Sequence, residues 1–216
     1  MRYFNAVKKN WGSAWSNQLF RLNLIVGVVI LISILTFTSF FFDYVENCPG
    51  GVVINDWVLK KLPSMDVSLP IVVFESSSVV LFLMRSTTNP LMCIKFLIAF
   101  LLVVTFRIIT IGLTQFNAPI GLIDLQDPIG SAVYRSGFVE RDLFYSGHTA
   151  ILFLIFLCSV KALDKYYVLF ATVIVGILLL IQHVHYTVDV VSAPFFAFVS
   201  FSLSKKWLNF QGIVMD

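Results

Sequence analysis

The stretch LNLIVGVVILISILTFTSFFF, residues 22–42, decides the fold class of this chain. It contains no charged residue, and it is as long as the roughly 20 apolar residues that a helix needs to cross a bilayer. The whole 216-residue chain shares this character, because 58% of its residues are hydrophobic and only 12% are charged. A soluble domain is about half apolar and about a quarter charged. The sequence therefore predicts an integral membrane protein.

Five further apolar stretches follow, at 68–84, 91–113, 147–163, 166–182 and 187–204. The stretch 68–84 is the least apolar, since it holds Pro70, Glu75 and a run of serines. Together the six stretches predict an all-α, polytopic membrane protein with six transmembrane helices in one bundle. The expected organisation is an amphipathic tail at 1–21, a transmembrane catalytic domain at 22–204 and a second tail at 205–216.

The Lys and Arg residues are divided unevenly between the two sides of such a bundle. The side that carries both tails has Arg2, Lys8, Lys9, Arg21, Arg85, Lys95, Lys161, Lys165, Lys205 and Lys206. The other side has Lys60, Lys61, Arg135 and Arg141, together with most of the acidic residues. Because Lys and Arg are enriched in cytoplasmic segments, both termini are expected in the cytoplasm.

Two polar clusters stand at the outer ends of apolar stretches, DLFYSGHTA at 142–150 and HVHYTVDVV at 183–191. They contain all three histidines of the chain, His148, His183 and His185. The charge distribution places both clusters on the outer face of the membrane. We therefore expect them to be two halves of one site.

The residue types in these clusters favour phosphoryl transfer. His185 and Asp189 are four residues apart at a predicted helix start, so they share a face. The carboxylate can fix the tautomer of the imidazole and leave its other nitrogen as a nucleophile. His148 follows Ser146 and Gly147 at another helix start, where backbone amides bind anions. His185 is predicted to attack phosphorus and form a phosphohistidine, while His148 protonates the leaving oxygen.

This chemistry requires no metal or other cofactor, but two alternatives stay open. A histidine at a membrane interface can be purely structural. Three histidines with nearby carboxylates can also bind zinc. The gathering of every histidine in the two clusters favours a functional site, and the Ser-Gly-His turn suits an oxyanion better than a metal.

Glu75 and Arg107 are charged residues at similar depths within predicted spans. An unpaired charge at such a depth is costly, so we expect them to pair with each other, or Arg107 to reach a substrate phosphate while Glu75 steadies it. A purely structural ion pair is the alternative. In the outer loop 115–146, Asp124 or Asp127 is predicted to hold a cationic head group, unless the loop is merely solvated.

The two clusters resemble the signature motifs of the sphingomyelin synthase branch of the type 2 phosphatidic acid phosphatase superfamily. The motif D-x3-S-G-H-T is matched by Asp142, Ser146, Gly147, His148 and Thr149, and the motif H-Y-T-x-D-V by His185, Tyr186, Thr187, Asp189 and Val190. The segment FRIITIGLT at 106–114 is similar to the family's Y-R-x3-M-x-T segment, with Arg107 in the arginine position.

The resemblance implies a catalytic triad of His148, His185 and Asp189. It implies transfer of a phosphocholine or phosphoethanolamine type of head group from a glycerophospholipid to a ceramide-like acceptor, on the outer or luminal face. The residues expected to contact the substrate are Asp142, Ser146, Gly147, Arg107, Tyr186 and Glu75. The expected partners are these lipids and the membrane, with no nucleic acid and no cofactor.

The chain also departs from that branch. Glu140 and Arg141 replace a Cys-Gly pair, and apolar residues around Pro194 replace aromatic and histidine positions after the second motif. The phosphatase branch would carry Ser-Arg where Leu178 and Leu179 stand. A lipid phosphate phosphatase on the same scaffold is an alternative, because water can attack the same intermediate. A non-catalytic lipid- or anion-binding bundle is another, although a transporter site is expected nearer the midplane.

Overall fold

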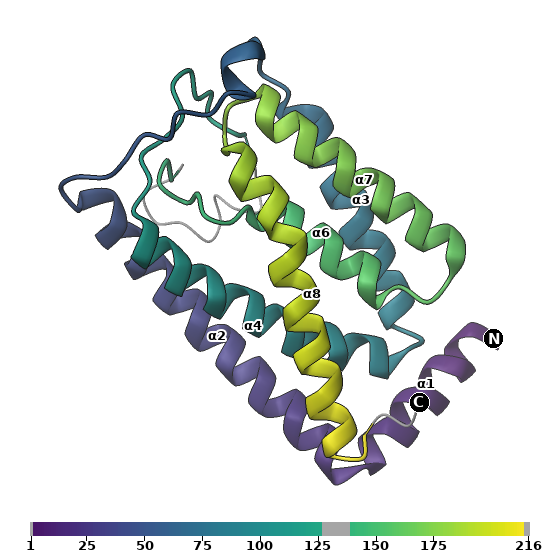
Figure 1. The fold of residues 1–216 in the computed structure, drawn as a ribbon. Helices are drawn as coiled ribbons and strands as arrows, with labels where there is room; N and C mark the ends of the chain where they lie inside the picture. Colours follow the sequence, from purple (N-terminus) through teal and green to yellow (C-terminus); the bar gives the residue numbers. More distant parts are fainter. Residues whose placement is uncertain (1, 127–138, 214–216) are drawn as a thin grey trace.

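The structure is a computed structural model that describes residues 2–126 and 139–213. Within these ranges the regular elements are helices, joined by loops that contain one isolated bridge between Val52 and Phe116. The helices are α1 (Arg2–Ser16), α2 (Gln18–Asn47), η1 (Leu59–Lys61), α3 (Ser68–Ser86), α4 (Pro90–Thr114), α6 (Gly147–Cys158), α7 (Ala162–Ile181) and α8 (Thr187–Phe210). The predicted all-α fold class is confirmed (Figure 1).

The prediction of six spanning helices needs a correction. In the part of the chain that the structure describes, five helices are long and apolar enough to cross a membrane: α2, α3, α4, α7 and α8. The sixth, α6, has 12 residues and is about 18 Å long, well short of the roughly 30 Å of a bilayer core. The predicted span 147–163 is wrong at its end, because the helix stops at Cys158 and α7 starts at Ala162.

Helix α6 is short because it lies inside the bundle. It packs against α3, α4, α7 and α8, and Figure 1 shows that it begins part-way along the bundle. Its residues Leu152 and Leu154 are fully buried. By contrast, α2 lies beside α4 and leaves apolar side chains such as Val29 and Ile32 exposed. In a membrane these side chains face lipid, whereas α6 is shielded from lipid by its neighbours.

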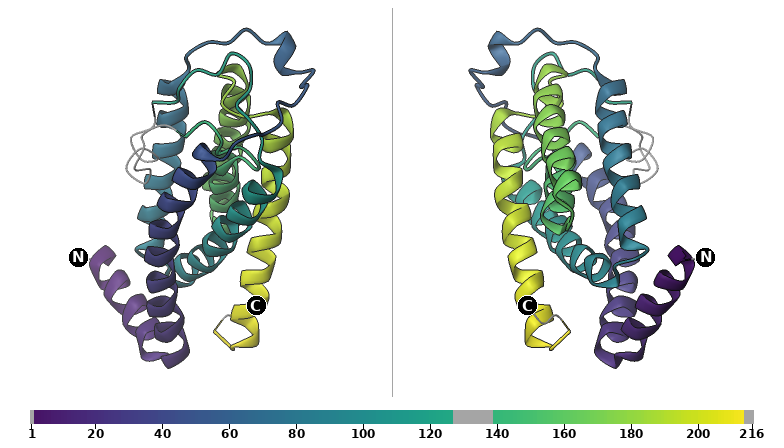
Figure 2. Two further views of the ribbon diagram at one scale, coloured as in Figure 1. Left: turned by 90° about the vertical axis from the view of Figure 1, so that its left-hand side faces the viewer. Right: turned by 90° about the vertical axis from the view of Figure 1, so that its right-hand side faces the viewer.

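Helix α1 is attached to the turn between α3 and α4. The indole of Trp11 donates to the carbonyl oxygen of Thr87, and the amide of Asn10 donates to that of Thr88, both at 2.8 Å. Asn17 ends this helix and caps α2 by accepting from two backbone amides. Figure 2 shows α1 leaning away from the bundle at the end opposite the outer loops 48–67 and 115–126.

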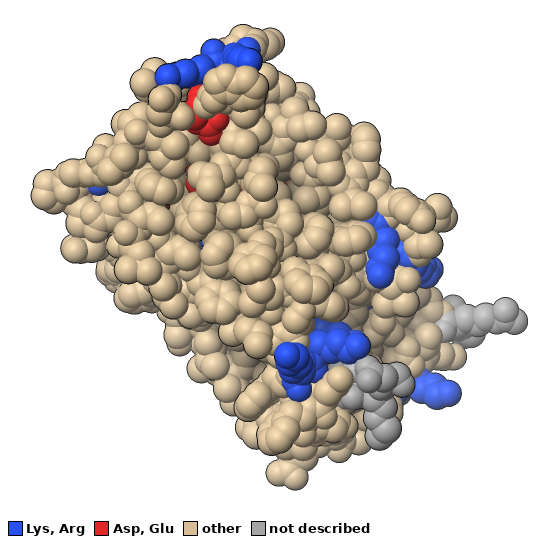
Figure 3. All heavy atoms as spheres, viewed as in Figure 1, with Lys and Arg blue, Asp and Glu red and all other residues tan. Residues whose placement is uncertain are grey.

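Charged side chains gather at the two ends of the bundle. On the face drawn in Figure 3, Lys and Arg lie mainly toward the end where α1 is found, and a second group lies at the loop end. The Asp and Glu atoms visible on that face lie near the loop end. The apolar middle between them fits the hydrocarbon core of a bilayer.

Candidate active site

The fold brings the two predicted clusters together. His148 is the second residue of α6, and His185 lies just before α8. Their ring centroids are 6.3 Å apart, with the ring planes inclined at 64°. The backbone joins the two segments as well, because the N–H of Ser146 donates to the carbonyl oxygen of Asp189 at 3.1 Å. One phosphoryl group can therefore contact both imidazoles.

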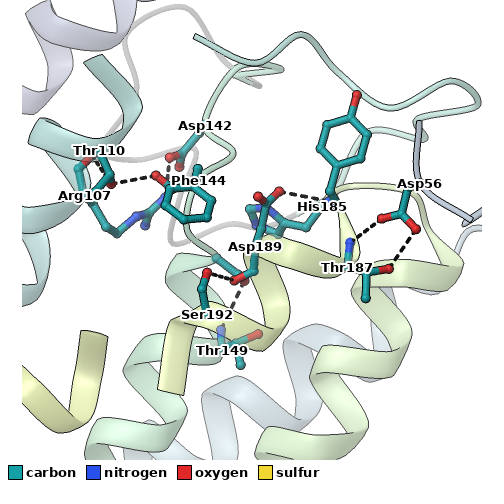
Figure 4. A network of polar contacts seen from close by, with 12 residues as sticks. Asp56, Arg107, Thr110, Asp142, Phe144, Thr149, His185, Thr187, Asp189 and Ser192 are labelled. Carbon is teal, nitrogen blue, oxygen red and sulfur yellow. Dashed lines mark hydrogen bonds and ion pairs between the residues drawn. The ribbon is translucent and has the colours of Figure 1, made fainter. Parts of the chain in front are cut away.

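His185 has a buried carboxylate beside it. Its Nδ1 lies 3.5 Å from Oδ2 of Asp189, and Figure 4 shows the two side chains meeting at the start of α8. Asp189 is fully buried, and its Oδ2 also accepts the backbone N–H of Tyr186 at 2.9 Å. Among the described residues, Oδ1 of Asp189 and Nδ1 of His185 have no hydrogen-bond partner. The carboxylate thus faces the imidazole and can stabilise a positive charge on it.

His148 has a carboxylate partner too, and this partner was not predicted. Its Nδ1 lies 2.9 Å and 3.1 Å from the two carboxylate oxygens of Glu75, which projects from α3. The expected pairing of Glu75 with Arg107 is therefore wrong. The side chain of His148 is 21% exposed, whereas that of His185 is 3% exposed. The contact with Glu75 engages Nδ1, so Nε2 is the nitrogen of His148 that does not face this carboxylate.

Arg107 pairs with Asp142 instead. Its Nη2 donates to Oδ1 of Asp142 across the site from His185 (Figure 4). Gly147 lies directly against the same guanidinium, because a Cβ built on Gly147 would stand 1.8 Å from Nη1 of Arg107. The first turn of α6 therefore admits the arginine only because residue 147 has no side chain. Asp142 balances the charge of the guanidinium, and the helix amino-terminus adds a partial positive charge that suits an oxyanion.

Two further residues expected to contact the substrate, Ser146 and Tyr186, are buried and bond to the backbone of the protein. Ser146 is fully buried and caps α6, since its Oγ accepts the backbone N–H of Thr149 at 3.4 Å. Tyr186 is 1% exposed; its hydroxyl donates to the carbonyl oxygen of Asn117 and accepts from the N–H of Ile54. Tyr186 therefore links the two outer loops to the segment that carries His185.

Sequence reasoning missed Asp56, which holds the start of α8. Its carboxylate accepts the backbone N–H of Thr187 at 2.7 Å and the Thr187 hydroxyl at 3.0 Å (Figure 4). Asp56 also accepts from Val58 and Leu59 in its own loop. No sequence pattern links residues 56 and 187, which lie on different outer segments. This contact fixes the helix turn that carries Asp189.

The pKa of Asp56 is lowered from its ordinary value of 3.8. Burial alone raises the pKa, but the hydrogen bonds from Thr187, Leu59 and Val58 outweigh that effect. Because the folded pKa is depressed, the contact stabilises the folded protein above the ordinary value and is lost as the pH falls through the folded pKa.

We expect Asp56→Ala to lower the free energy of unfolding by about 1 kcal/mol near neutral pH, as for a lost helix cap. The difference from the wild type should shrink as the pH falls below about 4, where the wild type loses the same contact. Melting temperatures in detergent, recorded over this pH range for both proteins, check the prediction. A difference that is constant with pH would contradict it.

His183 serves a different purpose from the other two histidines. Its Nδ1 lies 2.9 Å from the carbonyl oxygen of Ile120, and its Nε2 lies 3.2 Å from that of Leu62. It therefore connects two outer loops.

Two loop acids were predicted to hold a cationic head group. The backbone carbonyl of Asp124 accepts from the side-chain amide of Gln182, and Asp127 lies outside the described residues. Across residues 2–126 and 139–213, no three His, Cys, Asp or Glu side chains cluster as a metal site would require.

Comparison with known families bears on the same segment. Residues 141–206 match the family described as PAP2 superfamily C-terminal. This segment is similar to the type 2 phosphatidic acid phosphatase superfamily. It carries α6, α7 and most of α8, and with them His148, His185 and Asp189. The match supports a lipid phosphatase or phosphotransferase type of function. No match is found among curated proteins.

Proposed function

We propose that the protein is a membrane-embedded lipid phosphotransferase that moves a phosphorylated head group from a glycerophospholipid to a ceramide-like alcohol. The observation that carries this proposal is the facing pair of imidazoles, each with its own carboxylate. Such a pair supplies a nucleophile and a proton donor for the two halves of a double displacement. The similarity of residues 141–206 to the PAP2 superfamily supports the same chemistry.

In the first half-reaction, the Nε2 lone pair of His185 forms a bond to phosphorus. The bond from phosphorus to the glycerol oxygen breaks, and this oxygen takes the proton from Nε2 of His148. Diacylglycerol then leaves. Asp189 acts as a positioning residue that stabilises the cationic phosphohistidine, while Glu75 orients His148 and stabilises its protonated form. Arg107 and the amino-terminus of α6 balance the charge on the phosphoryl oxygens.

In the second half-reaction, the acceptor hydroxyl gives its proton to His148 and attacks phosphorus. The bond between phosphorus and His185 breaks, and the transferred head group leaves on the acceptor. No net proton is gained or lost over the two steps, so His148 serves as acid and then as base.

The burial of the site supports an alcohol acceptor rather than water. His185 and Asp189 are 2% and 0% exposed. The hydroxyl of Tyr186 and the carboxylate of Asp56 hold the outer loop around Ile54 close to α8. A phosphohistidine shielded in this way favours an acceptor that enters from the lipid phase over bulk water.

We further propose that residues 1–21 and 205–216 are cytoplasmic and that residues 22–204 form the catalytic domain. The uneven distribution of Lys and Arg supports this orientation. In this proposed orientation the site lies on the periplasmic or luminal side. Protease accessibility of tags at either terminus, in sealed oriented vesicles, tests the orientation directly.

Product analysis tests the function. Purified protein in vesicles receives labelled phosphatidylcholine and phosphatidylethanolamine, with and without ceramide. A new phosphosphingolipid plus diacylglycerol, formed only with ceramide, is the expected result. Diacylglycerol or a free phosphorylated head group without ceramide dependence would make the protein a hydrolase. No turnover in any arm would favour a binding protein.

Gly147→Ala tests the proposed phosphate-binding position between Arg107 and the amino-terminus of α6. The added Cβ would stand 1.8 Å from Arg107 Nη1, so the guanidinium must shift and its contact with Asp142 must change. We expect turnover to fall by about 100-fold, the loss typical of a misplaced binding group. Ceramide-dependent diacylglycerol release per folded molecule is the measurement.

Gly112→Ala is the matched control, because this glycine lies on α4, the helix that carries Arg107. Its Cβ would lie 3.8 Å from the ring of Phe41, an ordinary contact. Turnover should therefore stay near the wild-type value. Equal losses in Gly147→Ala and Gly112→Ala would overturn the role given to Gly147.

A further inference from the structure

A cavity lies at the opposite end of the bundle from His148 and His185. It has a volume of about 700 Å³, within the range of ligand-binding sites. Its walls come from the α1–α2 junction, the α3–α4 turn and the α6–α7 turn, together with Ile213 near the carboxyl end. Figure 1 marks both chain termini at this end. The mechanism proposed above uses none of these residues.

The lining of this cavity is cationic. Arg85 and Lys161 both line it. Arg85 is paired with Asp164, with Nε 2.7 Å from Oδ2 and Nη2 3.1 Å from Oδ1, so the carboxylate balances one of the two cations. Lys161 is exposed and adds a further positive charge. An anionic group entering the cavity is therefore attracted by a net positive lining.

The amino-termini of helices add to the positive charge of the lining. The residues that precede α2, α4 and α7 are Asn17, Asn89 and Lys161, and all three line the cavity. Three helix amino-termini, each with a partial positive charge, thus converge on one space. Asn17 and Asn89 cap their own helices. Lys161 makes no side-chain cap, and Asp164 in the first turn of α7 is paired with Arg85.

The remaining lining fits an amphiphile better than a small ion. Ser13 and Thr88 offer hydroxyl groups beside the asparagine amides, whereas Phe20, Leu91 and Met92 provide apolar surface. Polar head-group atoms can bond to the first set, and the first methylene groups of an acyl chain can pack on the second. The ends of five apolar spans place the cavity at a membrane surface.

We propose that this cavity binds the phosphate-bearing head group of an anionic phospholipid, at the membrane face opposite the reaction site. Lys161 and Arg85 contact the phosphate, and the amides of Asn17 and Asn89 contact head-group hydroxyls. Helix α1 contributes Asn10 and Ser13 to the wall of the cavity.

Native mass spectrometry of the full-length protein tests the proposal. The protein is mixed with phosphatidylglycerol and phosphatidylcholine of identical acyl chains, and the retained lipid is measured. We expect preferential retention of phosphatidylglycerol. Lys161→Gln should lower that retention about five-fold, as for the loss of one basic contact, without changing the melting temperature. Ser13→Trp, which fills the cavity from α1, should lower retention of phosphatidylglycerol.

Lys165→Gln is the matched control. This lysine lies one turn further along α7 and does not line the cavity, so retention should be unchanged. Equal loss in Lys161→Gln and Lys165→Gln would show only general surface attraction and overturn the site. A loss in Lys161→Gln that is equal for phosphatidylglycerol and phosphatidylcholine would also overturn it. Displacement of the lipid by glycerol 3-phosphate at matched concentration would identify a soluble phosphate compound as the ligand and overturn the lipid assignment.

Discussion

His185→Ala is expected to abolish turnover, with a loss of about 10⁴-fold or more, as for removal of a nucleophile from a double-displacement enzyme. His185 is nearly fully buried beside Asp189, and no other imidazole lies on that carboxylate among the described residues. The decisive measurement uses a lipid labelled in its phosphorus. Wild-type protein should acquire a label that survives base and is lost in acid, as a phosphohistidine would, and His185→Ala should acquire none.

The control is His183→Ala, which alters a histidine two residues away that contacts the carbonyl oxygens of Ile120 and Leu62. Removing that bridge between loops should lower the melting temperature but leave the label and the turnover per folded molecule in place. A His185→Ala protein that folds and still becomes labelled would refute the assignment of the nucleophile. Binding of the donor lipid, measured separately, should persist in both variants.

Hydropathy predicted those parts of the fold that are long, apolar and exposed to lipid. Long apolar stretches exposed to lipid are visible in the sequence, and the predicted 68–84 and 91–113 correspond to α3 and α4 within a few residues. The end of α6 was missed because Val160 and Leu163 continue the apolar stretch through a turn. Hydropathy cannot separate a spanning helix from a short helix that other helices surround.

In the candidate site, contacts between residues close in sequence could be predicted, whereas contacts between distant helices could not. Spacing alone predicted that His185 and Asp189 would meet, because four residues near a helix start fix their relation. Depth along the spans was estimated for Glu75 and Arg107, and their similar depths suggested a pair. Depth does not give the rotation of a helix about its axis. Glu75 therefore faces His148, and no sequence pattern could have shown it.

This second carboxylate–imidazole contact leads to a separate prediction for His148. If His148 supplies the proton to the departing diacylglycerol, His148→Ala should lower turnover of a natural lipid by about 10²–10⁴-fold, the range for a lost general acid. In a nitrophenyl ester of the same head group, the leaving group is nitrophenolate, a stable anion that needs no proton. With that donor, formation of the phosphohistidine in His148→Ala should proceed within about ten-fold of the wild-type rate. Rapid-mixing measurement of nitrophenolate release gives this rate.

Glu75→Gln provides the graded comparison, because Glu75 acts through His148 Nδ1. It should show a smaller loss than His148→Ala with the lipid donor and almost none with the nitrophenyl donor. His185→Ala, in contrast, should fail with both donors, since the bond to phosphorus cannot form. Equal losses of His148→Ala on the two donors would mean that His148 binds the head group rather than protonating the leaving group. The dependence on the leaving group thus separates the acid from the nucleophile in a site where the two imidazoles face each other at 6.3 Å.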